Sequence, residues 1–443
     1  MVACDQGFSG MMPPSHGLSI GGARFTRRVA CGLSFLVVIL VVLRPHPETG
    51  NAWVDVFACD VVLAPIFAGL WGLQVLMKGF NLSTVIPVAL VASLTSVIAF
   101  SGNLVGAQRV ATLIYLVTAL QSLLWMLASQ PVAARYMRRT LHVAFLVSFM
   151  LAVAQAVEID PFGAITSLFG QAKLKPMSSS TLRVFGSYYN ANWAGCAACC
   201  WLSLVWLELT SESNKRALWV CLGLIALGYV AMTGSRSAGI STAVLLAFAL
   251  AWLAWSRKRM AIVVLCIGAT AALLSLAGDS GWIIDKFEST RWATIFQLED
   301  QASFKERLTA WGQAIDSWRS SPYMGVGKLP EDQLPHNSLL SVLSSVGAVG
   351  AAAVLTSLVF IVRPYLHGRA PGLWWLGSIS AIILCFLTGD FIWSTQVSLT
   401  VILLVCCGAS TIPSRARSSR LLKRELKITA QTNLQCTRPS AAR

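Results

Sequence analysis

Charged residues are scarce in this chain. They make up 12% of its 443 residues, about half the share in soluble globular domains, whereas hydrophobic residues make up 56%. The 16 tryptophans fit the same pattern, because tryptophan favours bilayer interfaces. This composition excludes an ordinary soluble protein and predicts that lipid surrounds most of the chain.

Acidic residues are scarcer than basic ones, at 19 against 34, which leaves a net charge of +15. An excess of this sign could serve nucleic-acid binding. The basic residues, however, lie in short loops between apolar runs and in the C-terminal segment, not on one soluble module. Orientation of membrane helices, which places basic loops in the cytoplasm, explains this distribution, and we predict no nucleic-acid partner.

Metal-binding patterns are also lacking. The sequence contains no Asp-x-Asp pair, and Glu158-Ile-Asp160 and Glu299–Asp300 are more typical of solvated loop charges. Nearly all of the 12 cysteines lie in apolar runs, where cysteine acts as a small hydrophobic residue. We predict neither a metal nor another cofactor, and no structural disulfide in the long loops outside the membrane.

Apolar runs long enough to cross a bilayer recur along the whole chain. They cover residues 29–43, 53–77, 84–101, 110–128, 141–157, 192–208, 216–233, 238–255, 260–277, 338–362, 372–388 and 391–409. We therefore predict an all-α, polytopic membrane protein with about 12 transmembrane helices. Its predicted parts are a cytoplasmic N-terminus at 1–28, a membrane domain at 29–412 and a basic tail at 413–443 that touches anionic membrane lipids.

The basic residues predict which loops lie on which side. With the N-terminus in the cytoplasm, most of the loop lysines and arginines fall inside, and the C-terminus is cytoplasmic as well. The short outer loops then carry one arginine each: Arg44, Arg109 and Arg236. Two longer loops, at about 158–191 and 279–335, fall outside, where long loops usually carry function.

The second outer loop contains a predicted amphipathic helix. Large apolar residues recur in it at alternating spacings of four and three, which is one face of a helix: Phe304, Leu308, Trp311, Ile315 and Trp318. We expect this helix to lie on the membrane surface or to cover the helix bundle as a lid. Packing alone explains the aromatic residues, but it does not explain Arg307.

Three polar motifs lie on the predicted outer side. The first is Arg183-Val-Phe-Gly186-Ser-Tyr-Tyr-Asn190-Ala-Asn192, which enters a membrane helix. The second is Thr233-Gly234-Ser235-Arg236-Ser237-Ala238-Gly239, a tight turn between two helices. The third is Gly325-Val-Gly327, followed by Pro335-His336-Asn337, then nine residues, then Gly347-Ala-Val-Gly350.

In this order, the motifs resemble those of the O-antigen ligase and polymerase superfamily, which are polytopic glycosyltransferases of the bacterial envelope. The resemblance covers roughly residues 180–350, and it departs from the family pattern at Ala191, where proline is usual. It implies a helical, GT-C-like enzyme of the bacterial inner membrane whose active site faces the periplasm. Its donor would be a polysaccharide linked to undecaprenyl diphosphate.

The residue types suit such a donor. A lipid-linked diphosphate presents negative charge at the membrane surface, and arginine binds phosphate oxygens in bidentate fashion. We predict that Arg183, Arg236 and Arg307 contact the diphosphate and stabilise it as it leaves. The alternative for each of them is an interfacial anchor, because arginine often has that role at a membrane boundary.

The acceptor is a sugar hydroxyl that must lose a proton. His336 is the predicted general base, because it is the one of five histidines that belongs to an outer motif. Direct attack would invert the anomeric centre, and no carboxylate is obviously placed for a covalent intermediate. Asn192, Ser235 and Asn337 are candidate supporting residues, although Asn190 and Asn192 are more typical of helix caps.

The favoured function is therefore O-antigen ligase: metal-independent, inverting transfer to a lipid A–core oligosaccharide. An O-antigen or exopolysaccharide polymerase and a protein O-oligosaccharyltransferase are alternatives with the same donor chemistry. A transporter or flippase is the alternative of a different class. Against it, the motifs lie at one face and not at the membrane midplane, and few ionisable residues lie deep in the helices, Asp55, Asp60 and Asp390 excepted.

Overall fold

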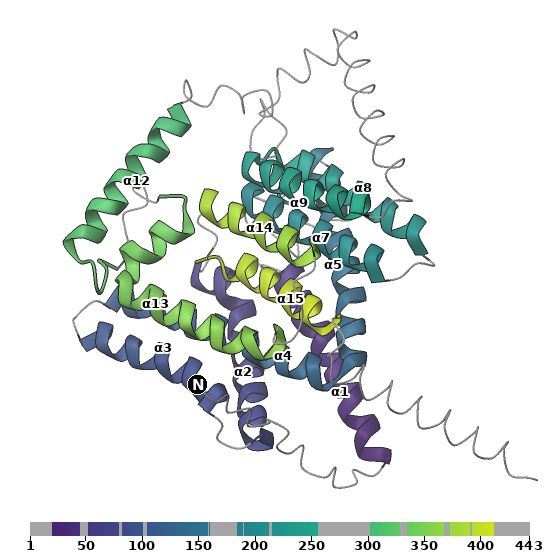
Figure 1. Cartoon of the computed structure of the whole chain (residues 1–443), viewed down its shortest axis with the longest axis horizontal. Coiled ribbons are helices and arrows are strands. Elements are labelled where there is room, and N and C mark those ends of the chain that lie inside the picture. Colours follow the sequence, from purple (N-terminus) through teal and green to yellow (C-terminus); the bar gives the residue numbers. More distant parts are fainter. Residues whose placement is uncertain are drawn as a thin grey trace, which may run out of the picture.

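The computed structural model describes residues 20–44, 52–78, 82–100, 104–157, 159, 184–188, 190–211, 215–255, 302–327, 335–366, 373–389 and 392–411. Over these ranges the chain forms 12 α-helices and a short π-helix, with no strand (Figure 1), which confirms the predicted all-α class. The helices are α1 (Ile20–Val38), η1 (Ile39–Leu43), α2 (Ala52–Lys78), α3 (Leu82–Phe100), α4 (Leu104–Ser129), α5 (Pro131–Ala156), α7 (Ala191–Ser211), α8 (Arg216–Thr233), α9 (Arg236–Trp255), α12 (Ala302–Ser320), α13 (Ser338–Leu366), α14 (Leu373–Thr388) and α15 (Thr395–Thr411).

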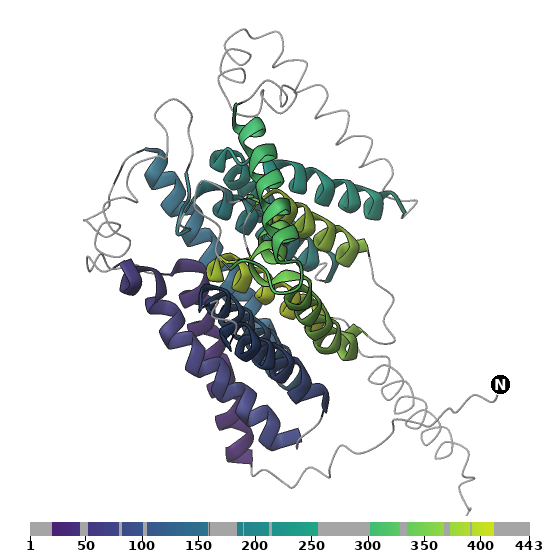
Figure 2. The same cartoon turned by 90° about the vertical axis from the view of Figure 1, so that its left-hand side faces the viewer.

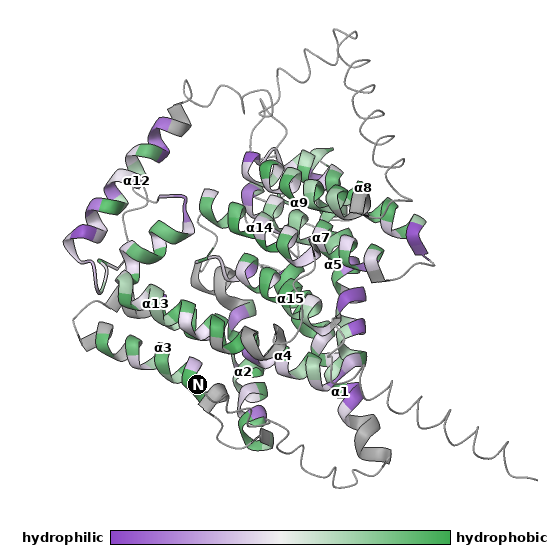
Figure 3. Ribbon diagram, viewed as in Figure 1, coloured by the Kyte–Doolittle hydropathy of each residue, from purple (hydrophilic) through white to green (hydrophobic). Residues whose placement is uncertain are grey.

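Apolar helices of membrane-spanning length confirm the predicted polytopic membrane protein. Seven helices are long and apolar enough to cross a bilayer, and four shorter apolar helices lie at 85–94, 236–251, 374–388 and 395–410. Together they match the predicted spans one for one, except 260–277, which lies outside the described residues. Three further predicted segments also lie wholly or partly outside the described residues: most of the loop at 158–191, part of the loop at 279–335, and the tail at 413–443. Figure 3 shows apolar residues along most of the helices and a mixed polar and apolar α12.

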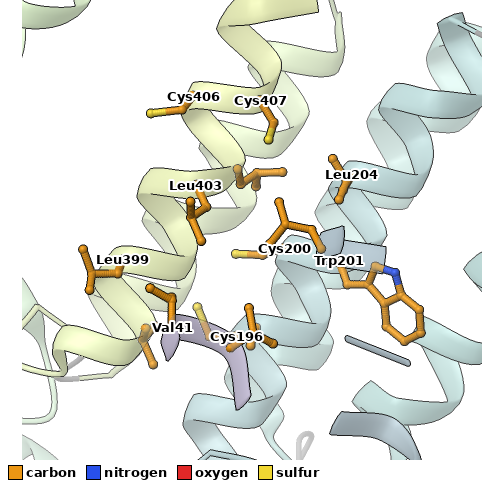
Figure 4. Packing of buried hydrophobic residues seen from close by; sticks show 14 of the residues in the cluster. Val41, Cys196, Cys200, Trp201, Leu204, Leu399, Leu403, Cys406 and Cys407 are labelled. Carbon is orange, nitrogen blue, oxygen red and sulfur yellow. The ribbon is translucent and has the colours of Figure 1, made fainter. Parts of the chain in front are cut away.

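Helix α7 forms the centre of the bundle. Its apolar span is 83% buried, against 28% for that of α8, and it contacts α8, α9, α14 and α15. Small side chains allow this close approach, because lipid itself provides no hydrophobic drive between helices. Figure 4 shows the contact with α15, in which Cys196, Cys200 and Leu204 of α7 face Leu399, Leu403 and Cys407. These cysteines are buried and unbridged, so they act as the predicted small hydrophobic residues.

Helix α5 starts ten residues before its predicted span, at Pro131. Proline suits the first turn of a helix, because its missing N–H would have no partner there. Arg135 and Arg139 therefore lie on the helix and not in a loop, which corrects the sequence-based expectation. Arg138 lies there as well and forms an ion pair of 2.7 Å with Glu208 of α7.

The predicted amphipathic helix is α12, which lies beside α13 at the margin of the bundle (Figures 1 and 2). Its most buried residues are two small ones. Ala310 and Ala314 are 6% and 1% exposed, whereas Leu308 of the predicted apolar face is 48% exposed. Small residues allow a closer approach than large ones, and Arg307, about one turn before Ala310 and two before Ala314, shares their side of the helix.

Candidate active site

The C-terminal end of α14 brings together the second and third motifs and α12. The carbonyl oxygen of Thr388 accepts hydrogen bonds from Ser237 Oγ at 3.5 Å and Arg307 Nη1 at 3.4 Å. The next carbonyl, that of Gly389, accepts one from Ser338 Oγ at 2.7 Å. The last carbonyls of a helix lack intrahelical partners and carry partial negative charge, so they attract donors and cations. Sequence reasoning did not identify this role of α14.

The Gly-Ser-Arg turn positions Arg236 at the start of α9. Gly234 ends α8 in the left-handed conformation, with φ of 57°. The hydroxyl of Ser235, which is buried, then accepts a hydrogen bond from the N–H of Ala238 at 3.4 Å and caps α9. Arg236, the first residue of that helix, is partly buried. Ser235 thus holds the turn through backbone contacts.

His336 stands between two anchored neighbours. Trp311 Nε1 of α12 donates to the carbonyl of Pro335 at 2.5 Å. Asn337 Oδ1 accepts from the N–H groups of Leu339 at 3.0 Å and Leu340 at 3.1 Å, and so caps α13. His336 itself is exposed and has φ of 46°, a left-handed conformation that is costly for a side chain other than glycine and is typical of functional sites.

The pKa of His336 lies below its usual value of 6.5. Desolvation by the surrounding protein is the larger cause, although the side chain reaches the surface, and the positive charge of Arg307 is the second. Both effects disfavour the imidazolium. The ring is therefore neutral at pH 7, which is the form that a general base requires.

Arg183 lies outside the described residues, but the segment that follows it is held firmly. The N–H of Val184 donates to the carbonyl of Met232 at 3.2 Å, two residues before the Gly-Ser-Arg turn. The side chain of Gln155, 1% exposed in α5, accepts from the N–H groups of Phe185 and Gly186 and donates to the Gly186 carbonyl. Sequence reasoning missed Gln155, and the only signal was a lone amide near the end of an apolar span.

The two asparagines that precede and begin α7 differ in role. Asn190 Oδ1 accepts a hydrogen bond from the N–H of Trp193 at 2.9 Å, which confirms it as a helix cap. Asn192 lies inside the first turn of α7, because this helix begins at Ala191. The expectation of a cap is therefore wrong for Asn192, and its place as a supporting residue stays a prediction.

The glycines of the third motif allow two backbone segments to pair. We call this pairing, between Gly325-Val-Gly327 and the residues just before Gly347, the glycine clasp. At Gly347, with φ of 68° and ψ of −174°, α13 is broken. The break frees the carbonyls of the preceding residues, so that Ser344 accepts from Val326 N–H at 2.7 Å and Ser345 from Gly327 N–H at 3.1 Å. The nine residues between Asn337 and Gly347 are thus one short helix. Asn337 caps its first turn, and the N–H groups of Val326 and Gly327 bind the carbonyls of its last turn. The predicted span at 338–362 is interrupted here.

A second polar cluster lies near the start of α15. Arg44, which is 4% exposed, pairs with Asp60 of α2 at 2.5 Å, and Thr395 hydrogen-bonds to both. Tyr115 donates to the other Asp60 oxygen at 3.1 Å. Sequence reasoning treated Arg44 as a loop charge and Asp60 as one of the few ionisable residues deep in a helix. Their pairing explains how a carboxylate is tolerated inside an apolar helix.

Comparison with known proteins gives a match that includes three of the predicted site residues. Residues 220–355 match the family model described as O-Antigen ligase, and no curated protein matches the chain. The match contains Arg236, Arg307 and His336, together with the glycine clasp. Residues 220–355 are thus similar to the O-antigen ligase family, which confirms the resemblance of this chain to the O-antigen ligase and polymerase superfamily.

Proposed function

We propose that this membrane protein is an O-antigen ligase. Members of its family are glycosyltransferase-like enzymes, ligases or polymerases. The single observation that supports catalysis at this site is the meeting of Arg307 and His336 beside the Gly-Ser-Arg turn at the end of α14. A fixed cation next to a neutral imidazole suits a reaction in which an anion leaves and a hydroxyl loses its proton.

The proposed donor is a polysaccharide on undecaprenyl diphosphate, and the proposed acceptor is a sugar hydroxyl of lipid A–core oligosaccharide. Arg236 and Arg307 bind the diphosphate, with Arg183 as a third predicted contact. The acceptor oxygen attacks the anomeric carbon while the bond from that carbon to the diphosphate oxygen breaks. The diphosphate leaves with the electron pair, stabilised by the arginines, and the configuration inverts.

His336 takes the proton of the attacking hydroxyl. Its lowered pKa keeps the ring unprotonated in the free enzyme. A bound diphosphate brings negative charge next to Arg307, which offsets the guanidinium and makes His336 a stronger base when the donor is in place. No step requires a metal, and the prediction of metal-independent transfer stands as part of this proposal.

Deleting the gene in its host, and complementing it with the wild type or with variants, tests the proposal. A ligase leaves lipid A–core without O-chains, and the polymer accumulates on its carrier lipid. The measurement is gel electrophoresis of the envelope glycolipids. Arg319→Gln is the matched control, because Arg319 is 71% exposed and pairs with Asp316 of its own helix.

Each outcome of this experiment separates the candidates. Rescue by the wild type and by Arg319→Gln, with core free of O-chains in the deletion, supports a ligase. Core that carries a single repeat unit would instead identify a polymerase. If the deletion leaves the gel pattern of O-chain lengths unchanged, lipid A–core is excluded as the acceptor. The acceptor would then be a protein or an exopolysaccharide.

Arg307→Gln is expected to shift the pH dependence of transfer. At donor concentrations well below KM, the wild-type rate should fall only as the pH drops below 6.5, because the pKa of His336 in the free enzyme lies under its usual value. Removing the guanidinium raises that pKa, so the fall moves to higher pH. The rate at pH 7.5 should also drop by about 100-fold, because one diphosphate contact is lost.

The measurement is the initial rate between pH 5 and 8 with purified donor and acceptor. Arg307→Lys retains the charge and should keep the acidic limb of the wild type, even with a lower rate. An acidic limb that stays in place in Arg307→Gln would show that Arg307 does not act on His336.

A further inference from the structure

A cavity lies between the middle of α1 and the first turns of α5, remote from the candidate active site. At the near end, Ser187 Oγ donates to the carbonyl of Val42, and Gln155 binds Gly186. At the far end lie Arg28 of α1 and Arg139 of α5. At 1.5 Å per residue, Arg139 is about 24 Å along the helix from Gln155. The far end is the one predicted to face the cytoplasm.

Four arginines line this cavity, which has a volume of about 890 Å³: Arg27, Arg28, Arg135 and Arg139. Gly32 and Tyr136 also line it, and none of the lining residues that the structure describes is acidic. None of the ion pairs formed within the described part of the chain involves these arginines. The cavity is thus a concentrated positive site of ligand size.

Its chemistry fits a phosphate group. Guanidinium groups bind phosphate oxygens in bidentate fashion, and four of them converge here from two helices. The N-terminus of α5 begins at Pro131, next to the cavity-lining Val132, so its partial positive charge adds to theirs. The need to orient membrane helices explains why basic residues lie on the predicted cytoplasmic side. It does not explain why four of them line one cavity.

Apolar surface continues from the arginines along both helices. On α5, Val143 and Val147 follow Arg139 at steps of four residues and are 59% and 39% exposed. On α1, Phe35 and Leu36 follow the cavity-lining Gly32 and are 48% and 39% exposed. A ligand with a phosphate head in the cavity would find room for its acyl chains along these side chains. A free phosphate would make no use of them.

We propose that this cavity binds the headgroup of an anionic phospholipid, with its acyl chains along α1 and α5. The bound lipid bridges the two helices and holds the arginines together, so it stabilises the bundle. This inference does not depend on the proposed transferase activity, because the cavity lies remote from the candidate active site.

The test is the melting temperature of the full-length protein, purified in a neutral detergent. Phosphatidylglycerol should raise it by about 3–5 °C at a 100-fold excess over its Kd, whereas phosphatidylcholine and inorganic phosphate should not. Arg135→Gln/Arg139→Gln should lose the shift. Arg216→Gln/Arg319→Gln removes two arginines that do not line the cavity and should keep it.

A second variant narrows the cavity without changing its charge. A β-carbon added at Gly32, which lines the cavity, would meet no atom within 4 Å, so Gly32→Trp should fold and still lose the shift caused by phosphatidylglycerol. Three results would overturn the proposal: an equal shift with inorganic phosphate, which would mean a site for small anions; an equal shift with phosphatidylcholine; or an unchanged shift in Gly32→Trp.

Discussion

His336→Asn is expected to lower the rate of transfer by about 100-fold to 10,000-fold, the usual range for loss of a general base. Asparagine cannot accept the proton of the acceptor hydroxyl. It does, however, tolerate the left-handed conformation that His336 adopts at φ of 46°, better than most residues do. The variant should therefore fold normally, with a melting temperature equal to or above that of the wild type.

The measurements are the transfer rate with purified substrates and the melting temperature of the same preparations. The small residual rate should also become independent of pH between 5 and 7, because the titrating group is gone. Leu339→Ala is a suitable control, since Leu339 is 54% exposed and lies three residues further on. A normally folded His336→Asn that retained more than a tenth of the rate would exclude His336 as the base.

Gly347→Ala is expected to have the largest effect on stability. Gly347 has φ of 68° and ψ of −174°, a combination that is essentially confined to glycine and costs other residues about 1–3 kcal/mol. A β-carbon there would lie 2.2 Å from the carbonyl oxygen of Tyr323, and overpacking of this kind adds about 1–3 kcal/mol. The clasp between α13 and the Gly325-Val-Gly327 segment should open, and His336 would lose its support.

The measurement is thermal unfolding in detergent, with the amount of protein in the membrane fraction as a second readout. Gly312→Ala is the matched control, because Gly312 lies inside α12 and a β-carbon added to it would meet no neighbouring atom within 4 Å. It should be neutral or stabilise by about 0.5–1 kcal/mol, since alanine favours helices. A melting temperature of Gly347→Ala equal to that of the wild type would contradict the role of the clasp.

Much of the fold was predictable, because membrane spans are a local property of the sequence. A run of apolar residues must satisfy its backbone hydrogen bonds within itself, so hydropathy alone predicts a helix. The predicted amphipathic helix within the second outer loop followed from the spacing of its large apolar residues, and it is confirmed as α12. The exact beginning of α5 was not predictable from hydropathy, because its first turns carry Arg135, Arg138 and Arg139 and extend beyond the apolar run.

The candidate site divides in the same way. The sequence by itself determined which residues have suitable chemistry: Arg236, Arg307 and His336 stand in motifs, because phosphate binding and proton transfer require those side chains. Only the tertiary structure decided which of them meet. Ser237 and Thr388 are 151 residues apart in the chain, and Arg307 and Thr388 are 81 residues apart.

The glycines and Gln155 show why local patterns fall short. A motif marks Gly325 and Gly347 as notable, but their purpose depends on the fit of two backbones that no local pattern records. Gln155 has no motif at all, and its importance comes from the three backbone contacts that it makes with Phe185 and Gly186. The sequence determined the membrane helices and the candidate reactive side chains, because both depend on local chemistry. The tertiary structure decided which motifs come together at the end of α14, because that depends on contacts between helices far apart in the chain.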